Sequence, residues 1–412
     1  MAHLNPDADT VENRDGTVGR MTVAFVDEEP VEHRRSRRSS MNGHYRAMRR
    51  GQRRMALAAG AMTAMTAIVA PHVAYGLQAH AAGTSSPYGV GVTRCTFVDR
   101  TRSVLDYATS PPSVLARQRT LVTEIRYPTL SQSPNHSEIT NAPPAQQADG
   151  FPMIVFAHGY DVTPGTYASL LETWTEKGFV VAAPIFPDES STEVNRQHVD
   201  TEGDIYNEPA DLAFVTRQLL ADSSTLSAAC PLVQGLVQPS ELAFAGHSDG
   251  ADAVGLLAYS TGRDPQGVSY ASLRQGLAIR ATMIFSGSED GTAPYRADPS
   301  QPPLLLVQSA RDQCNAPDEG LELYGAISQG DKWFLELLHA HHLPPFDGED
   351  RAAFDVVATT TTSFLQFALS HTLSASSLQS TGNARPLVGR LNRGGAGPTI
   401  ALYLDAPPCG FH

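Results

Sequence analysis

Residues 241–260 read ELAFAGHSDGADAVGLLAYS, and this stretch decides the fold. An apolar run at 242–245 leads into GHSDG at 246–250, and an Ala- and Leu-rich segment follows at once. The run predicts a buried strand and the segment predicts a helix. A serine between two glycines at such a turn belongs either to an ordinary connection or to a nucleophile whose hydroxyl is held out of the sheet. The rest of the chain decides between these two interpretations.

Apolar runs alternate with helix-length segments from about residue 121 onward. The runs are LVTEIRYP, FPMIVFAHG, GFVVAAPIF, ELAFAGHS, RATMIFSGS, PPLLLVQSARD and KWFLELLHA. Continuous apolar runs, rather than alternating ones, indicate strands that are covered on both faces. We therefore expect an α/β fold with a mostly parallel central sheet flanked by helices.

Reactive groups in such sheets gather at the carboxyl ends of the strands. The run ELAFAGHS ends at Ser248, PPLLLVQSARD ends at Asp312, and KWFLELLHAHH ends near His342. Serine, then acid, then histidine is the chain order of a nucleophile elbow followed by its two partners. The sequence thus predicts a catalytic triad of Ser248, Asp312 and one histidine from the cluster at 339, 341 and 342. The N–H of Asp249, at the start of the predicted helix, is the first candidate donor to a developing oxyanion.

Two of these assignments have competitors. Asp290 also ends a strand, but Asp312 follows the later strand and lies one strand before the histidine, so we favour Asp312. His341 is a neighbour of His342 and could displace it by one residue, and His339 completes a three-histidine cluster. Such a cluster could supply metal ligands, but no carboxylate or cysteine accompanies it at zinc-like spacing. We expect no metal and no cofactor.

The chain resembles the α/β-hydrolase superfamily over roughly Thr96 to Ala368. The resemblance rests on TEIRYP, VFAHGY, GFVVAAPIFP, AGHSDGA, DQCNAPDEGLELY and FLELLHAHHLPPF. The chain is most similar to the branch that includes dienelactone-hydrolase-like proteins, platelet-activating-factor-acetylhydrolase-like esterases and cutinase-like polyester hydrolases. The resemblance implies an α/β-hydrolase fold, places the catalytic base at His342, and makes the backbone of Tyr160 the second oxyanion donor. The Tyr160 ring would either line the substrate site or pack the loop.

The segment between RATMIFSGS and PPLLLVQSARD is too short for a large cap domain, which favours an open site for bulky or polymeric esters. We expect an ester hydrolase that works through an acyl-enzyme. Two alternatives stay open: a non-catalytic binding protein with the same fold, and a serine peptidase. The acyl chain, the alcohol and the physiological substrate are not encoded in any motif that we recognise.

The N-terminal fifth of the sequence is organised differently from the rest. The 412 residues have a net charge of −13, but residues 1–82 contain more Lys and Arg than Asp and Glu. The rest of the chain is therefore strongly acidic, and it carries no basic stripe that could bind a nucleic acid. Arginines followed by an apolar run of 16 residues and small residues predict a secretory signal at about 49–81. The run is shorter than the roughly 20 residues of a membrane span. We expect a secreted monomer with no stable membrane insertion.

Three regions follow from this reading: a leader with its signal at 1–82, a catalytic domain at 83–375 and a C-terminal tail at 376–412. The start methionine is open, since Met41 and Met48 also precede the signal. Four cysteines, at positions 95, 230, 314 and 409, suit an oxidising compartment and allow two disulfides in three pairings.

Overall fold

The computed structural model describes residues 88–107, 109–133, 137–192, 202–221, 224–288, 295, 301–327 and 330–399. The predicted leader and signal, Asp290 and Cys409 lie outside these residues. The described residues belong to one compact unit, which begins at Ala82. Among them, no helix combines the length and the apolar character that crossing a bilayer requires.

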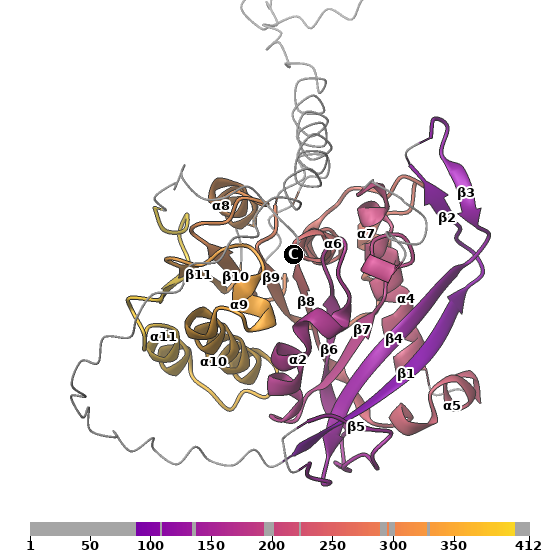
Figure 1. Cartoon of the computed structure of the whole chain (residues 1–412), viewed down its shortest axis with the longest axis horizontal. Coiled ribbons are helices and arrows are strands. Elements are labelled where there is room, and N and C mark those ends of the chain that lie inside the picture. The colour runs from indigo at the N-terminus through magenta and orange to yellow at the C-terminus, as the bar shows by residue number, and fades with distance from the viewer. Residues whose placement is uncertain are drawn as a thin grey trace, which may run out of the picture. The chain divides into compact units, whose positions relative to one another are not determined.

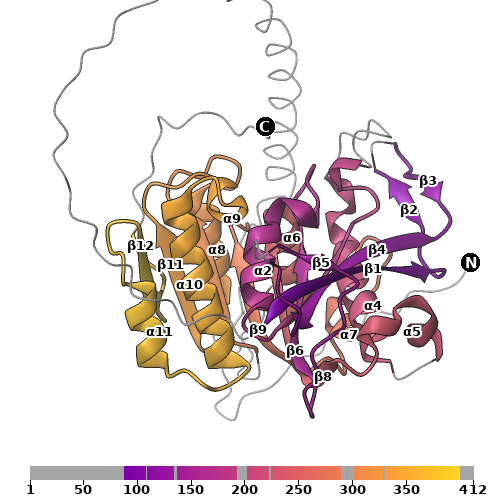
Figure 2. The ribbon, with the colours of Figure 1, turned by 60° about the horizontal axis from the view of Figure 1, so that its bottom comes forward.

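Within the described residues, ten strands form a single sheet in the order β12-β11-β10-β9-β8-β6-β7-β4-β1-β5 (Figures 1 and 2). The pairs from β7 through β6, β8, β9 and β10 to β11 are parallel, whereas β4 pairs antiparallel with β7 and with β1, and β12 pairs antiparallel with β11. The strands of this sheet are β1 (Gly89–Asp99), β4 (Arg119–Thr129), β5 (Ile139–Thr140), β6 (Phe151–Ala157), β7 (Val180–Pro184), β8 (Val237–His247), β9 (Ile279–Phe285), β10 (Leu304–Ser309), β11 (Lys332–Leu337) and β12 (Gly389–Arg393). Each of the seven apolar runs overlaps one of these strands, so the predicted mostly parallel sheet is confirmed.

Successive side chains of each central strand point to opposite faces and enter two separate apolar clusters. In β6, Met153 and Val155 belong to one cluster, and Ile154 and Phe156 belong to the other. Helices cover both faces, which is why these strands are apolar at every position. The first cluster takes its α-helical residues from α4, α5, α6 and α8, and the second takes them from α2, α9, α10 and α11. Figure 2 shows α10 and α11 side by side on one face.

The helices begin and end as follows: α2 (Ala168–Thr175), α4 (Glu208–Leu220), α5 (Ser224–Ala229), α6 (Asp249–Tyr259), α7 (Tyr270–Leu273), α8 (Pro317–Ala326), α9 (Pro344–Asp347), α10 (Arg351–Ala368) and α11 (Ala375–Gly382). Three short 3₁₀ helices are η1 (Pro164–Tyr167), η2 (Gly203–Tyr206) and η3 (Pro231–Val233), and a small separate hairpin joins β2 (Val104–Asp106) to β3 (Ser113–Ala116). Most of α11 and all of β12 lie in the stretch assigned to a C-terminal tail, so part of that stretch completes the sheet.

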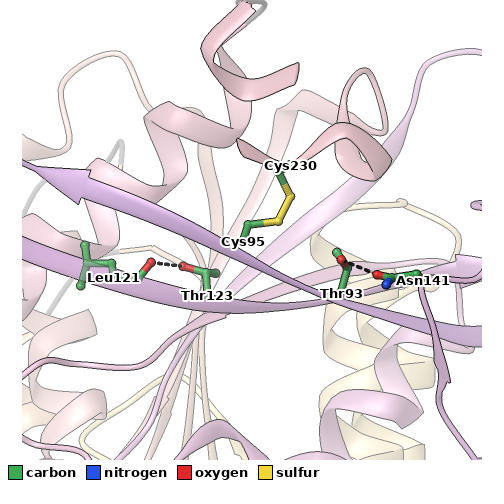
Figure 3. The surroundings of a disulfide bond; sticks show 6 residues. All are labelled: Thr93, Cys95, Leu121, Thr123, Asn141 and Cys230. Atoms are coloured by element: carbon green, nitrogen blue, oxygen red, sulfur yellow. Dashed lines mark hydrogen bonds between the residues drawn. A yellow bond between two sulfur atoms is a disulfide. The ribbon is translucent and has the colours of Figure 1, made fainter. Parts of the chain in front are cut away.

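A disulfide joins Cys95 in β1 to Cys230, which lies between α5 and η3 (Figure 3). The two residues are 135 positions apart and both are buried. A cross-link over so long a stretch restricts the unfolded chain, and in general such a bond stabilises a fold by about 2–4 kcal/mol. Cys314 is also disulfide-bonded, and no cysteine among the described residues is free.

Candidate active site

Ser248 occupies a sharp turn between β8 and α6. Its backbone has φ 55° and ψ −125°, a conformation that a non-glycine residue rarely adopts, and the backbone N–H groups of Ala251 and Asp252 donate to its carbonyl oxygen. A Cβ at Gly246 would collide with the carbonyl of Gly250 across the turn. The glycine at 246 is therefore required by the close approach of strand and helix, and the GHSDG turn is not an ordinary connection.

Asp312 and His342 form a buried pair. The carboxylate of Asp312 accepts hydrogen bonds from the backbone N–H groups of Cys314 and Asn315, both at 3.0 Å, and a longer one from the side chain of Gln308. Nδ1 of His342 lies 2.9 Å from both carboxylate oxygens. A carboxylate accepts, so Nδ1 carries the hydrogen and Nε2 presents a lone pair. Nε2 is buried and has no hydrogen-bond partner among the described residues.

The competing residues are placed differently. Asp290 lies outside the described residues. His339 is exposed and His341 is partly exposed, and within the described part of the chain neither forms a hydrogen bond with Asp312. The geometry thus brings Asp312 together with His342, the register that the resemblance implies.

His247 connects the nucleophile turn to the histidine loop. It directly precedes Ser248 and is almost completely buried, and its ring centroid lies 4.5 Å from that of His342 and 4.8 Å from that of Phe346. Its Nε2 lies 3.1 Å from the backbone oxygen of His342. The described residues show no direct hydrogen bond between the Ser248 hydroxyl and His342. Such bonds are often long without substrate and tighten when it binds.

The loop after β6 lies against the nucleophile. A Cβ built at Gly159 would stand 3.0 Å from Cβ of Ser248, so a larger residue here would require the nucleophile turn to shift. Tyr160 directly follows Gly159 in this loop and is buried. Asp249, the other predicted donor, is the first residue of α6. Both predicted oxyanion donors therefore belong to segments that adjoin Ser248.

His158 supports this loop rather than the reacting groups. Its Nδ1 lies 2.8 Å from the carbonyl oxygen of Gly159, and its Nε2 accepts from the N–H of Phe186 at 3.1 Å. Both ring nitrogens are thus used by the neutral form, and burial lowers the pKa of His158 to about 4. The residue is a fixed, neutral hydrogen-bonding group.

Two further carboxylates near the turn are fully buried. Glu189 follows β7 and Glu208 begins α4, and neither has a hydrogen-bond partner for its carboxylate oxygens among the described residues. Burial, followed by the nearby charge of Asp249, raises the pKa of both well above the usual value. The sequence analysis did not single out either glutamate. Each lies among other polar residues, and Asp249, whose charge acts on both in the fold, comes from a distant part of the chain.

The ligand atoms of Asp312, Cys314 and His342 all lie within 4.8 Å of one another. A thiolate is the form of cysteine that binds metals, and Cys314 is disulfide-bonded, so this group is a poor metal donor set. The short distances follow from the Asp312–His342 pair and from the turn that places Cys314 over the carboxylate.

The chain matches the family model described as Chlorophyllase over residues 116–273. This range includes the loop at Tyr160 and the turn at Ser248, and it ends before Asp312. A search of curated proteins finds no match. Among solved structures, the ferulic acid esterase from Streptomyces cinnamoneus is similar, with 18% sequence identity and a TM-score of 0.52 over 72% of this chain and 94% of that one.

At that identity the structural match bears on the fold, and the family match covers the segment that carries the nucleophile turn. Together with the mostly parallel sheet, the two matches support an ester hydrolase of the α/β-hydrolase superfamily.

Proposed function

We propose that the protein is a secreted serine hydrolase of carboxylic esters, with Ser248 as nucleophile, His342 as general base and Asp312 as the residue that orients the base. The observation that carries this proposal is the state of His342. Its Nδ1 is committed to Asp312, and its buried Nε2 lone pair has no partner among the described residues. An imidazole held in this tautomer next to a strained serine turn is prepared to accept a proton.

The reaction proceeds in two steps. Oγ of Ser248 attacks the ester carbonyl while its proton passes to Nε2 of His342, and the resulting imidazolium is stabilised by Asp312. The tetrahedral intermediate collapses, the C–O bond to the alcohol breaks, and the alcohol leaves with the proton from His342. Water then attacks the acyl-enzyme by the same route and releases the acid.

The backbone N–H groups of Tyr160 and Asp249 are proposed to stabilise the oxyanion. Asp249 lies at the N-terminus of α6, where the helix dipole favours negative charge. Losing one such donor commonly costs about 3 kcal/mol of transition-state stabilisation. The short segment between β9 and β10 supports a site that admits bulky esters, although most of it lies outside the described residues.

Secretion is supported by the buried Cys95–Cys230 disulfide, since such bonds persist in oxidising compartments. The predicted signal at 49–81 is the second support. Expression of the full chain in a bacterium with an export pathway, followed by N-terminal sequencing of the extracellular product, tests this. A mature terminus near residue 82 is expected, and retention of the uncleaved chain in the cell contradicts it.

The test of activity uses chromogenic esters and a fluorophosphonate probe. Ser248→Ala should lose both ester turnover and labelling. Ser286→Ala is a matched control, because Ser286 also follows a central strand, is buried and has a positive φ of 48°. It should keep both. A protein that is never labelled would be a binding module, and labelling with amide turnover alone would indicate a peptidase.

A further inference from the structure

We propose that Tyr167 and His247 form a positioning relay that links the loop at Gly159 to the loop of His342, and that the hydroxyl of Tyr167 is required for full turnover. This inference rests on the proposed function, because Tyr167 and His247 are proposed to position His342, the proposed base. Neither residue is proposed to touch the substrate.

The hydrogen bonds of the relay have one consistent set of directions. The backbone oxygen of His342 can only accept, so Nε2 of His247, at 3.1 Å, carries the hydrogen. Nδ1 of His247 then has a lone pair, and the hydroxyl of Tyr167 donates to it at 2.9 Å. The hydroxyl oxygen in turn accepts from the backbone N–H of Gly159 at 3.3 Å. Reversing the tautomer of His247 would place a lone pair against a carbonyl oxygen.

The relay crosses the middle of the sheet. Gly159 follows β6 and His342 follows β11, and β8, β9 and β10 lie between these strands. His247, at the end of β8, is therefore placed to reach both loops, and burial lowers its pKa well below the usual value, which keeps it neutral. The chain of bonds fixes the backbone of the base relative to the loop that adjoins the nucleophile.

Packing holds both relay rings in place. The ring of His247 lies against His342, Phe346 and Tyr167, with centroids 4.5, 4.8 and 5.5 Å away. Tyr167 is fully buried at the end of η1, and its ring also packs on Phe156 at 4.9 Å. A buried hydroxyl without partners is costly, so both hydrogen bonds of Tyr167 also help to define where η1 ends.

The relay acts on His342 through its backbone, whereas Asp312 acts through its side chain. The imidazole of His342 thus has two independent constraints, one on Nδ1 and one on the main chain that carries it. Losing either allows the ring to shift relative to Ser248. Displacements of about 1 Å can cost up to about 100-fold in rate, so we expect about a tenfold loss when only the second constraint is weakened.

The test is Tyr167→Phe, which keeps the ring and removes the hydroxyl. The matched control is Tyr324→Phe. Tyr324 is also fully buried, and its hydroxyl donates to the backbone oxygens of Lys332 and Gly394, both at 3.2 Å. Lys332 begins β11, and Gly394 directly follows β12. Thermal unfolding should show similar destabilisation in both variants, which separates folding from catalysis.

Two assays are run on folded protein. Ester kinetics gives kcat and KM for a chromogenic substrate, and a second assay gives the rate of fluorophosphonate labelling. Tyr167→Phe should lower kcat and the labelling rate about tenfold with little change in KM, and Tyr324→Phe should leave all three near wild type. Wild-type rates in Tyr167→Phe, or equal losses in the two variants, overturn the relay. Activity that survives Ser248→Ala would instead overturn the proposed function, so the two failures are distinct.

Discussion

Nδ1 of His342 lies 2.9 Å from both carboxylate oxygens of Asp312, a residue thirty positions earlier in the chain. The two residues come from loops after neighbouring parallel strands, β10 and β11. Adjacent strands of this kind carry their carboxyl ends to the same edge of the sheet, and that is why two groups far apart in sequence meet there. The pair defines the tautomer of the imidazole and so the direction in which it can accept a proton.

Asp312→Asn should reduce kcat by up to about 10⁴, because an amide keeps the shape but allows the wrong tautomer of His342. Asp290→Asn is the comparison, and it should lose little, since an Asp-Gly pair in a sequence is typical of a turn whose aspartate contributes a local hydrogen bond at most. Ester kinetics on both purified variants decides. A large loss at Asp290 instead would move the acid to the preceding strand and leave the assignment of Ser248 intact.

His342→Ala and His341→Ala should differ sharply. The first removes the imidazole that Asp312 contacts, so kcat should fall by several orders of magnitude. The second removes a partly exposed ring, and activity should stay within a few-fold of wild type. Steady-state rates at saturating ester measure both. Equal losses, or a loss confined to His341, would shift the assignment of the base by one residue.

Most of the sheet could be predicted because it depends on short-range signals, and the pairing of Asp312 with His342 was expected from the strand ends together with the resemblance. Strands that are buried on both faces are apolar at every position, and their ends mark where functional side chains gather. β1 and β12 escaped prediction for the opposite reason. β1 mixes Arg94 and Asp99 with apolar residues, and β12 reads GRLNR, so neither contains a continuous apolar run.

The supporting residues of the site depend on contacts that no local pattern encodes. Tyr167 is one tyrosine in the polar stretch DVTPGTYAS, and its partner His247 lies eighty residues away. Glu189 lies in the turn after β7 and Glu208 begins α4, and the two become neighbours only through the packing of β7, α4 and α6. A spacing rule can find a nucleophile, but the groups that hold its partners are defined by tertiary structure.

Glu189→Gln and Glu208→Gln should raise the melting temperature by a few degrees at pH 8 and by less at pH 5. Burial raises the pKa of both carboxyls, so the folded state prefers the neutral form, and its stability falls as pH rises from the ordinary carboxyl range through the folded pKa. A neutral amide removes this penalty, and it can donate to neighbouring carboxylates. Calorimetry at the two pH values measures the difference.

Glu349→Gln is the matched control for these two variants, because Glu349 is exposed. It should leave the melting temperature unchanged at both pH values. If Glu189→Gln and Glu208→Gln lower the melting temperature more at pH 8 than at pH 5, the two carboxylates are stabilised by charge in the folded protein, and the argument from burial is wrong.

His158 should make the fold less stable as pH falls below neutrality. Its ordinary pKa of 6.5 drops to about 4 in the folded protein because the ring is buried, and protonation would also destroy the bond that Nε2 accepts from Phe186. The stabilisation of the fold by neutral His158 is therefore complete above pH 6.5. It is lost progressively between pH 6.5 and 4, since only the unfolded chain takes up the proton there. At pH 5 the loss should be about 2 kcal/mol, at 1.36 kcal/mol for each unit of pH.

His158→Gln isolates this contribution, because the glutamine oxygen can still accept from Phe186 but does not titrate. Urea unfolding at pH 7.5 and pH 5 gives the free energy of unfolding of both proteins, and every other titrating group cancels in the comparison. The wild type should lose about 2 kcal/mol more than the variant over this interval. If both proteins lose the same free energy of unfolding, His158 takes up its proton in the folded state near its ordinary pKa of 6.5. The hydrogen bonds at Gly159 and Phe186 would then not hold it neutral.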